Sequence, residues 1–162
     1  MSHFKGVILA VGGVDGTGSH KKAEVYKGSV EGWTIVDDYP LQNSIRQAAV
    51  VYIEPADTFF LIGGWDDSAF DSVSNIVEYN YVSGNWTDLS SLGLKLNTPR
   101  FNHGAIFVNE TMFVAGGDGT VLSEQCSPND LTGSLECHEI SPSLASYRGP
   151  PILFPVESNY CP

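Results

Sequence analysis

The sequence predicts an all-β fold assembled from repeated antiparallel units, each made of four short strands. Glycine pairs recur 51 and 53 residues apart, and each pair ends an apolar run long enough for one strand. No stretch of the chain shows the 3.6-residue period of an amphipathic helix. Turn-forming residues separate the apolar runs instead, in a chain with 17 glycines and 9 prolines. The pairs are Gly12-Gly13, Gly63-Gly64 and Gly116-Gly117.

Two further features recur with the glycine pairs. In each of the first two units a tyrosine stands seven residues before a tryptophan, and arginines open the apolar runs at 46, 100 and 148. This content at a period near fifty residues resembles the kelch repeat, in which each repeat forms one four-stranded blade of a β-propeller. The aromatic pairs are Tyr26 with Trp33 and Tyr79 with Trp86.

The resemblance implies one kelch-repeat domain over residues 1–162, with strands for about three four-stranded antiparallel blades. Residues 1–45 are then an incomplete blade that lacks its first strand, and residues 46–99 are a complete blade. Residues 100–147 are the third blade. Residues 148–162 supply the first strand of a further blade or a closing strand. The chain would form a partial propeller or half of a six-bladed ring.

In the first unit, three strands are expected, counted as the second, third and fourth of a blade. The six residues before Val7 are too few for a first strand and its turn. The first of the three is a near-continuous apolar run, which predicts burial on both faces. The three segments are GVILAVGG (6–13), AEVYKG (23–28) and WTIVDDY (33–39).

In the second unit, the apolar run after Arg46 and the run that ends at Gly63-Gly64 predict a hairpin. Its turn is Glu54-Pro55-Ala56-Asp57, because proline and aspartate favour turns. The segment IVEYNY (76–81) is the predicted third strand, and the fourth begins at Trp86.

In the third unit, RFNHGAIFVNETMFVAGG (100–117) predicts a hairpin with its turn at Asn109-Glu110. A long loop then leads to SLECHEI (134–140) as the third strand, with Cys137 in the tyrosine position. Leu144 stands where a tryptophan is expected, so the fourth strand is predicted to be degenerate.

The tail predicts one more strand, over residues 148–156. Its apolar residues alternate as those of a half-buried strand do. Three prolines in the tail remove ladder donors, which favours an edge position for this strand. The alternating residues are Ile152, Phe154 and Val156.

The charge balance excludes some classes of partner. The net charge is −11, from 19 acidic and 8 basic residues, whereas nucleic-acid and anionic-membrane binding need clustered lysine and arginine. No transmembrane segment and no signal peptide are visible. The absent signal peptide favours the cytoplasm. Glycosylation sequons at Asn85 and Asn109 and the clustered cysteines favour the outside of the cell, so the compartment stays open.

The three cysteines, Cys126, Cys137 and Cys161, form an odd set without the spacing of a metal site. They are either reduced thiols or one disulfide with a spare thiol. A disulfide between Cys126 and Cys137 would fasten the long loop of the third unit. No metal ion or other cofactor is predicted.

Candidate binding residues lie where the loops and inner strands of the units would meet. The kelch resemblance implies that the arginines before the inner strands line a ligand-binding surface at the channel mouth. The guanidinium suits a carboxylate or a phosphate, and the alternative is a pair with an acidic residue of a neighbouring blade. Acidic loop residues are either solvated turns or a rim that favours a basic or polar partner. The candidates are Arg46, Arg100, Arg148, His103, Asp66 and Asp67.

Two functions compete. The first is a non-catalytic module that binds another protein through loops on a rigid scaffold. The second is a kelch-fold enzyme that resembles the copper sugar oxidases or the sugar mutarotases. The four histidines fall in unlike positions of the repeat, and no spacing predicts a catalytic residue. About three blades are too few to close a ring. Two chains head to tail would give six blades, and the alternative is further blades in a longer chain.

Overall fold

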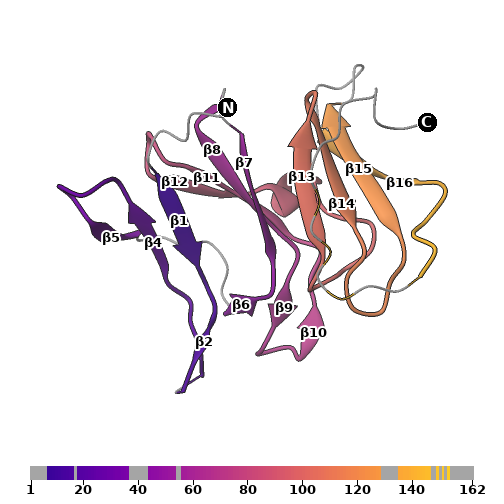
Figure 1. Cartoon of the computed structure of the whole chain (residues 1–162), viewed down its shortest axis with the longest axis horizontal. Coiled ribbons are helices and arrows are strands. Elements are labelled where there is room, and N and C mark those ends of the chain that lie inside the picture. Colours follow the sequence, from indigo (N-terminus) through magenta and orange to yellow (C-terminus); the bar gives the residue numbers. More distant parts are fainter. Residues whose placement is uncertain are drawn as a thin grey trace.

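The computed structural model describes residues 7–16, 18–36, 44–53, 56–128 and 135–146, together with Gly149, Pro151 and Leu153. Every described strand pairs antiparallel and these residues contain no α-helix, so the all-β prediction is confirmed (Figure 1). Arg148 and Glu54-Pro55 lie outside the described residues, and so does most of the strand predicted over 148–156.

The first sheet contains β1 (Ile8–Val11), β4 (Ala23–Tyr26) and β5 (Trp33–Val36), in that order. These are the three strands that the sequence predicts for the first unit. The connection between β1 and β4 also forms a hairpin, β2 (Val14–Asp15) with β3 (Gly18–Ser19), which the sequence does not predict.

The second sheet contains four strands in chain order, as the apolar runs of the second unit predict. The pairing of β7 with β8 and of β8 with β11 keeps Phe59 opposite Tyr52 and Tyr79, so aromatic side chains gather on one face. A 3₁₀ turn, Leu89–Leu92, follows the last strand. The strands are β7 (Ala49–Ile53), β8 (Thr58–Ile62), β11 (Ile76–Asn80) and β12 (Asn85–Asp88).

A small separate sheet lies at one end of the second sheet (Figure 1). It is built from β6 (Ile45–Arg46), β9 (Trp65–Asp66) and β10 (Asp71–Ser72), with β9 in the centre. Arg46 therefore belongs to β6 and pairs in register with Trp65, whereas the longer inner strand β7 begins only at Ala49.

The third sheet corrects the sequence interpretation of the third unit. Its strands are β13 (Gly104–Val108), β14 (Thr111–Ala115), β15 (Ser123–Pro128) and β16 (Leu135–Ile140), in chain order. The predicted long loop thus contains the third strand, β15. The segment assigned to the third strand is the fourth, and no degenerate strand at Leu144 is needed. The sequence SEQCSP lacks an alternating apolar pattern, so pairing on both sides rather than local propensity makes it a strand.

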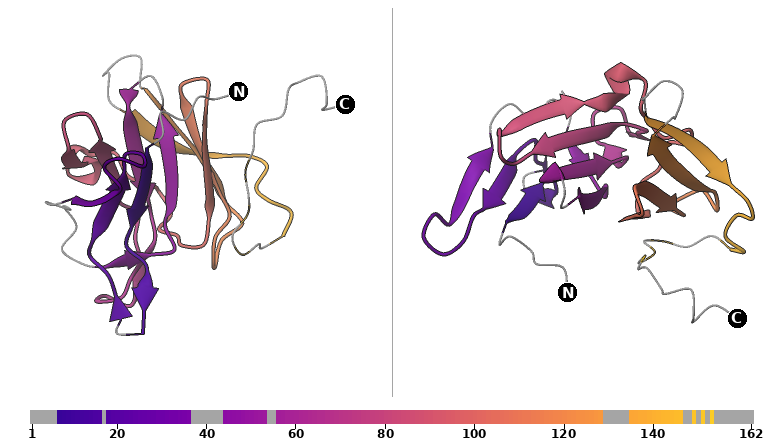
Figure 2. Two further views of the ribbon diagram at one scale, coloured as in Figure 1. Left: turned by 60° about the vertical axis from the view of Figure 1, so that its left-hand side comes forward. Right: turned by 90° about the horizontal axis from the view of Figure 1, so that it is seen from above.

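Seen from above, the three sheets are arranged like a fan (Figure 2, right). The second sheet packs through one face against the first sheet, in a cluster with Val25, Phe59 and Tyr79. Through its other face it packs against the third sheet, in a cluster with Ile62 and Met112. Strands β7 and β13 lie next to one another on the inner side of the fan.

Cross-strand pairs occupy matching places in the three sheets. Tyr26 pairs with Trp33 in the first sheet, and their ring centroids are 5.5 Å apart. Tyr79 pairs with Trp86 in the second sheet at 4.6 Å. The third sheet has a disulfide between Cys126 and Cys137 at this place, again between register partners. The disulfide thus joins two neighbouring strands, where the other sheets have an aromatic pair.

The glycine pairs stand where the next unit crosses the sheet closely. Gly63 has φ +56°, and a Cβ there would lie 2.6 Å from the Arg100 carbonyl oxygen and 2.8 Å from His103 Cε1. The neighbouring Gly64 N–H donates to the same Arg100 oxygen at 2.8 Å. A Cβ on Gly12 would likewise collide with the Ile45 carbonyl oxygen. Only glycine therefore fits at these crossings.

The sequence analysis matches the units by their arginines, Arg46 with Arg100. These crossings show that this match is wrong by one residue. The residue that meets the first glycine is Ile45 in one junction and Arg100 in the next. Arg46 therefore corresponds to Phe101, and Arg46 and Arg100 do not hold matching positions. Because a shift of one residue in extended chain reverses the direction of a side chain, the two arginines have different surroundings.

Candidate functional site

The best candidate site is the loop face, which we define as β6, the β9–β10 hairpin and the connection between sheets at Phe101 and Asn102. These segments lie together at the bottom of the view in Figure 1, beyond the ends of the longer strands. Trp65 and Phe101 form its aromatic centre, with ring centroids 4.9 Å apart in an edge-to-face arrangement. The Asn102 N–H donates to the Gln47 carbonyl oxygen at 3.0 Å, so backbone bonds fix the two loops to one another.

Arg46 and Asp67 form an ion pair on the loop face. The Arg46 Nε lies 2.9 Å from Oδ1 and 3.1 Å from Oδ2 of Asp67. Both side chains are partly exposed, at 34% and 26%. Arg46 Nη1 also donates to Gln47 Oε1 at 3.2 Å. The pair leaves part of the Arg46 side chain at the surface.

The β9–β10 hairpin is held by Asp66, which is buried and shapes the turn. Its Oδ1 accepts from the Ser68 N–H at 2.7 Å and from the Ala69 N–H at 3.1 Å. Asp66 is therefore a structural turn residue, in contrast to the surface role that the sequence predicts for it. The turn holds Phe70 outward, with φ +54° and 78% of the residue exposed.

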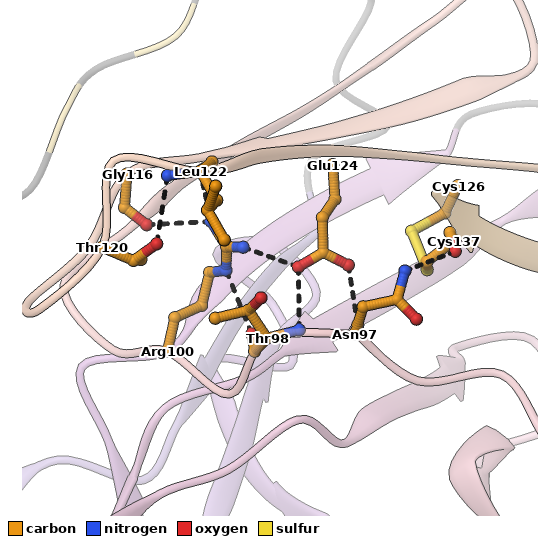
Figure 3. A network of polar contacts seen from close by, with 9 residues as sticks. All are labelled: Asn97, Thr98, Arg100, Gly116, Thr120, Leu122, Glu124, Cys126 and Cys137. Atoms are coloured by element: carbon orange, nitrogen blue, oxygen red, sulfur yellow. Dashed lines mark hydrogen bonds and ion pairs between the residues drawn. A yellow bond between two sulfur atoms is a disulfide. The ribbon is translucent and has the colours of Figure 1, made fainter. Parts of the chain in front are cut away.

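Arg100 lies in the interior of the protein, with 0% of its side chain exposed. Its Nη1 donates to the carbonyl oxygens of Gly116 at 3.0 Å and Leu122 at 2.7 Å, and its Nε donates to Thr98 at 3.2 Å (Figure 3). Its Nη2 bonds Oε1 of the equally buried Glu124 at 2.6 Å. The guanidinium therefore offers no surface to a partner and serves to join the segment before β13 to β14 and β15.

Glu124 completes this network from β15. Its two carboxylate oxygens accept the backbone N–H groups of Asn97 at 2.7 Å and Thr98 at 3.1 Å (Figure 3). The Asn97 Nδ2 donates to the Cys137 carbonyl oxygen at 2.6 Å. The connection between the second and third sheets is thus fastened to β15 through Glu124 and to β16 through Cys137. Buried charges need such partners, because an unpaired one carries a large desolvation cost.

His103 is buried between the second and third units, with 6% exposed. Its Cε1 faces the Cα of Gly63 and its Cβ faces that of Gly117. Neither ring nitrogen makes a well-aligned hydrogen bond among the described residues. Burial, the largest cause, and the nearby charge of Arg100 lower the pKa of His103 to about 4, against a smaller opposing effect of the Ile62 backbone. The imidazole is therefore neutral at pH 7, which fits a packing residue.

His103 is expected to make the fold sensitive to acid. Folding lowers the pKa of His103. The imidazole therefore binds a proton below pH 6.5 in the unfolded chain, but only below about pH 4 in the folded chain. The contribution of neutral His103 to the free energy of unfolding is fully present above pH 6.5. It falls by about 2–3 kcal/mol as the pH drops to 4. Urea unfolding at several pH values measures this. The variant His103→Gln should lose less stability over the same window; an equal loss in both proteins contradicts the assignment.

The remaining predicted residues lie apart from the loop face. Asn85 and Asn109 are exposed at hairpin turns, Asn85 at the start of β12 and Asn109 between β13 and β14. Among the described residues no group of three or more His, Cys, Asp or Glu side chains is placed to hold a metal ion. No helix within the described ranges is long and apolar enough to cross a membrane.

Sequence reasoning missed Phe70 and the Trp65–Phe101 pair. Phe70 follows four small or acidic residues in a polar loop, where a lone aromatic residue was a usable signal. Comparison with known proteins adds no assignment, since no protein-family model matches the chain and no curated protein is significantly similar to it.

Proposed function

We propose that the chain is part of a kelch-type β-propeller and acts as a non-catalytic protein-interaction module that binds another protein through the loop face. The repeated antiparallel sheets, and the glycine pairs at the two described crossings, support the propeller part of the proposal. The sheets are fastened to one another by packing and by buried polar contacts, so they give the loops a rigid support.

The observation that carries the binding proposal is the exposed Phe70. A large aromatic side chain with positive φ and 78% exposure is unfavourable in the isolated chain on two grounds, backbone strain and hydration of apolar surface. A partner that buries the ring would offset both. Near its base lie a tryptophan and the Arg46–Asp67 pair, residue types that are enriched in binding hot spots.

The test compares Phe70→Ala with Val82→Ala. Val82 is also exposed, at 70%, but it lies in the turn between β11 and β12 at the opposite end of the sheet. Proteins retained from a cell extract by the immobilised chain are quantified by mass spectrometry. We expect Phe70→Ala to lower retention of the specific partner by about tenfold, the effect of losing one hot spot, and Val82→Ala to leave it unchanged. Equal retention by all three proteins would reject the loop face as the binding site.

The enzyme alternative has a separate test. A copper sugar oxidase holds its metal ion in stoichiometric amounts, so elemental analysis of the purified chain separates the two functions. Stoichiometric copper or iron that survives dialysis would overturn the non-catalytic proposal, whatever the result at Phe70.

A further inference from the structure

Each sheet has one face that carries the Tyr–Trp or Cys–Cys pair. This face is covered in the second and third sheets and exposed in the first sheet. In the second sheet, Phe59 and Tyr79 of this face are 5% and 2% exposed, because the face packs against the first sheet. In the third sheet, Met112 and Cys126 are 6% and 2% exposed, because the face packs against the second sheet. One mode of packing is therefore used twice within the chain.

Among the described residues, no sheet packs against the matching face of the first sheet. The register of β1, β4 and β5 places two rows of side chains on it, and we call it the open face. Its apolar residues are exposed far beyond their counterparts: Ile8 48%, Trp33 51% and Ile35 62%. The rows of the open face are Ile8, Tyr26 and Trp33, then Ala10, Glu24 and Ile35.

The third sheet has the complementary surface at the other end of the fan. In both internal contacts, the face with the Tyr–Trp or Cys–Cys pair packs against the face of the preceding sheet that lacks such a pair. The latter face carries Leu9 and Val25 in the first sheet and Val51 and Ile62 in the second. The same side of the third sheet, which we call the far face, carries Ile106, Phe113, Gln125 and His138. Of the described tail residues, Pro151 and Leu153 lie against this face at the Gly104 end of β13.

Charge also favours a contact between these two ends. Three of the chain's 8 basic residues flank β4 of the first sheet, and all three are exposed. The outer strand of the third sheet, β16, carries two acidic residues, one on the far face, Glu136, and one on the opposite face, Glu139. Opposite charges at the rim of an apolar contact guide and align two surfaces. The basic residues are Lys21, Lys22 and Lys27, and the acidic residues are Glu136 and Glu139.

We propose that the open face binds the far face of a second copy of this chain, head to tail. The contact repeats the two sheet-to-sheet contacts already present within the chain, with the aromatic pair of the open face packed on the far face, where Ile106 and Phe113 lie beside the more polar Gln125 and His138. Because the two surfaces differ, the contact is heterologous, and it ends either in a closed ring or in a longer chain of copies. The loop face takes no part, so the result at Phe70 neither supports nor weakens this proposal.

Light scattering and sedimentation on the full chain test the proposal. We expect assemblies larger than the 17.5 kDa chain, with a mass that rises with concentration. Ile35→Glu places a second carboxylate beside Glu24 on the open face and should weaken association at least about a hundredfold. The matched control is Val30→Glu in the turn between β4 and β5, where the residue is 98% exposed, and association should stay unchanged.

Photo-crosslinking then identifies the opposing surface. A photoreactive phenylalanine in place of Ile35 should attach to peptides of β13–β16 from another copy. Circular dichroism spectra that match the wild type show that each variant is folded. A monomer at every concentration, association that Ile35→Glu leaves intact, or crosslinks only to peptides of the first sheet would each overturn the proposal.

Discussion

Replacing Arg100 with methionine is expected to lower the free energy of unfolding by about 3–5 kcal/mol, the range for breaking a buried ion pair. The methionine fills much of the same volume but leaves Glu124 charged, 0% exposed and without its closest partner. The carbonyl oxygens of Gly116 and Leu122 lose a donor at the same time. Urea unfolding, followed by the fluorescence of the three tryptophans, measures the loss.

The matched control is Arg46→Met, which breaks the partly exposed pair with Asp67. Solvent screens that pair, so its loss should cost less than about 1 kcal/mol. The double variant Arg100→Met with Glu124→Gln removes the stranded charge and should regain part of the lost stability. If Arg100→Met costs no more than Arg46→Met, the buried network does not stabilise the fold.

Removing the disulfide is expected to lower the free energy of unfolding by about 2–5 kcal/mol, the usual range for a native disulfide in a small domain. Cys126 and Cys137 are both buried at the contact between the second and third sheets. Reduction therefore removes the covalent link between β15 and β16 at the point where the sheet packs, and leaves their backbone pairing in place. The measurement is urea unfolding with and without a reductant.

Two double variants separate the covalent bond from the packing. Replacing both cysteines with valine keeps apolar volume at the contact, so its cost measures the loss of the crosslink alone. Replacing both with alanine adds a cavity and should cost more. Cys161→Ser shows whether the third thiol exchanges with the pair. An unfolding midpoint that a reductant leaves unchanged in the wild type would refute the prediction.

The repeated residues predict most of the strands but not their chemistry. The strands of the first two units are found because apolar runs, glycine pairs and aromatic residues repeat together. Strand β15 is missed because its residues are polar, and because Glu124 is placed by a residue far away in sequence, Arg100. The spacing Glu124-x-Cys126 does match Glu24-x-Tyr26, so a cysteine in the tyrosine place was the available signal.

The candidate site is less predictable than the fold. Alignment by residue type makes Arg46 the equivalent of Arg100 in the preceding unit. The close crossings at Gly12 and Gly63 show that the structural equivalent of Arg100 is Ile45. A sequence shows which residues repeat, but not which one meets the backbone of the preceding unit. The exposure of Phe70 likewise depends on the turn that Asp66 stabilises, and local composition does not reveal it.

The shift between Ile45 and Arg100 gives the two close crossings different chemistry. Ile45, 4% exposed, meets Gly12 as a buried apolar residue, whereas Arg100 meets Gly63 as one partner of a buried ion pair. Apolar burial stabilises less as water is cooled, whereas the desolvation cost of an ion pair falls as water is heated. Apolar stabilisation levels off at high temperature while the ion pair continues to gain, so strong heating is expected to weaken the contacts of Ile45 before those of Arg100.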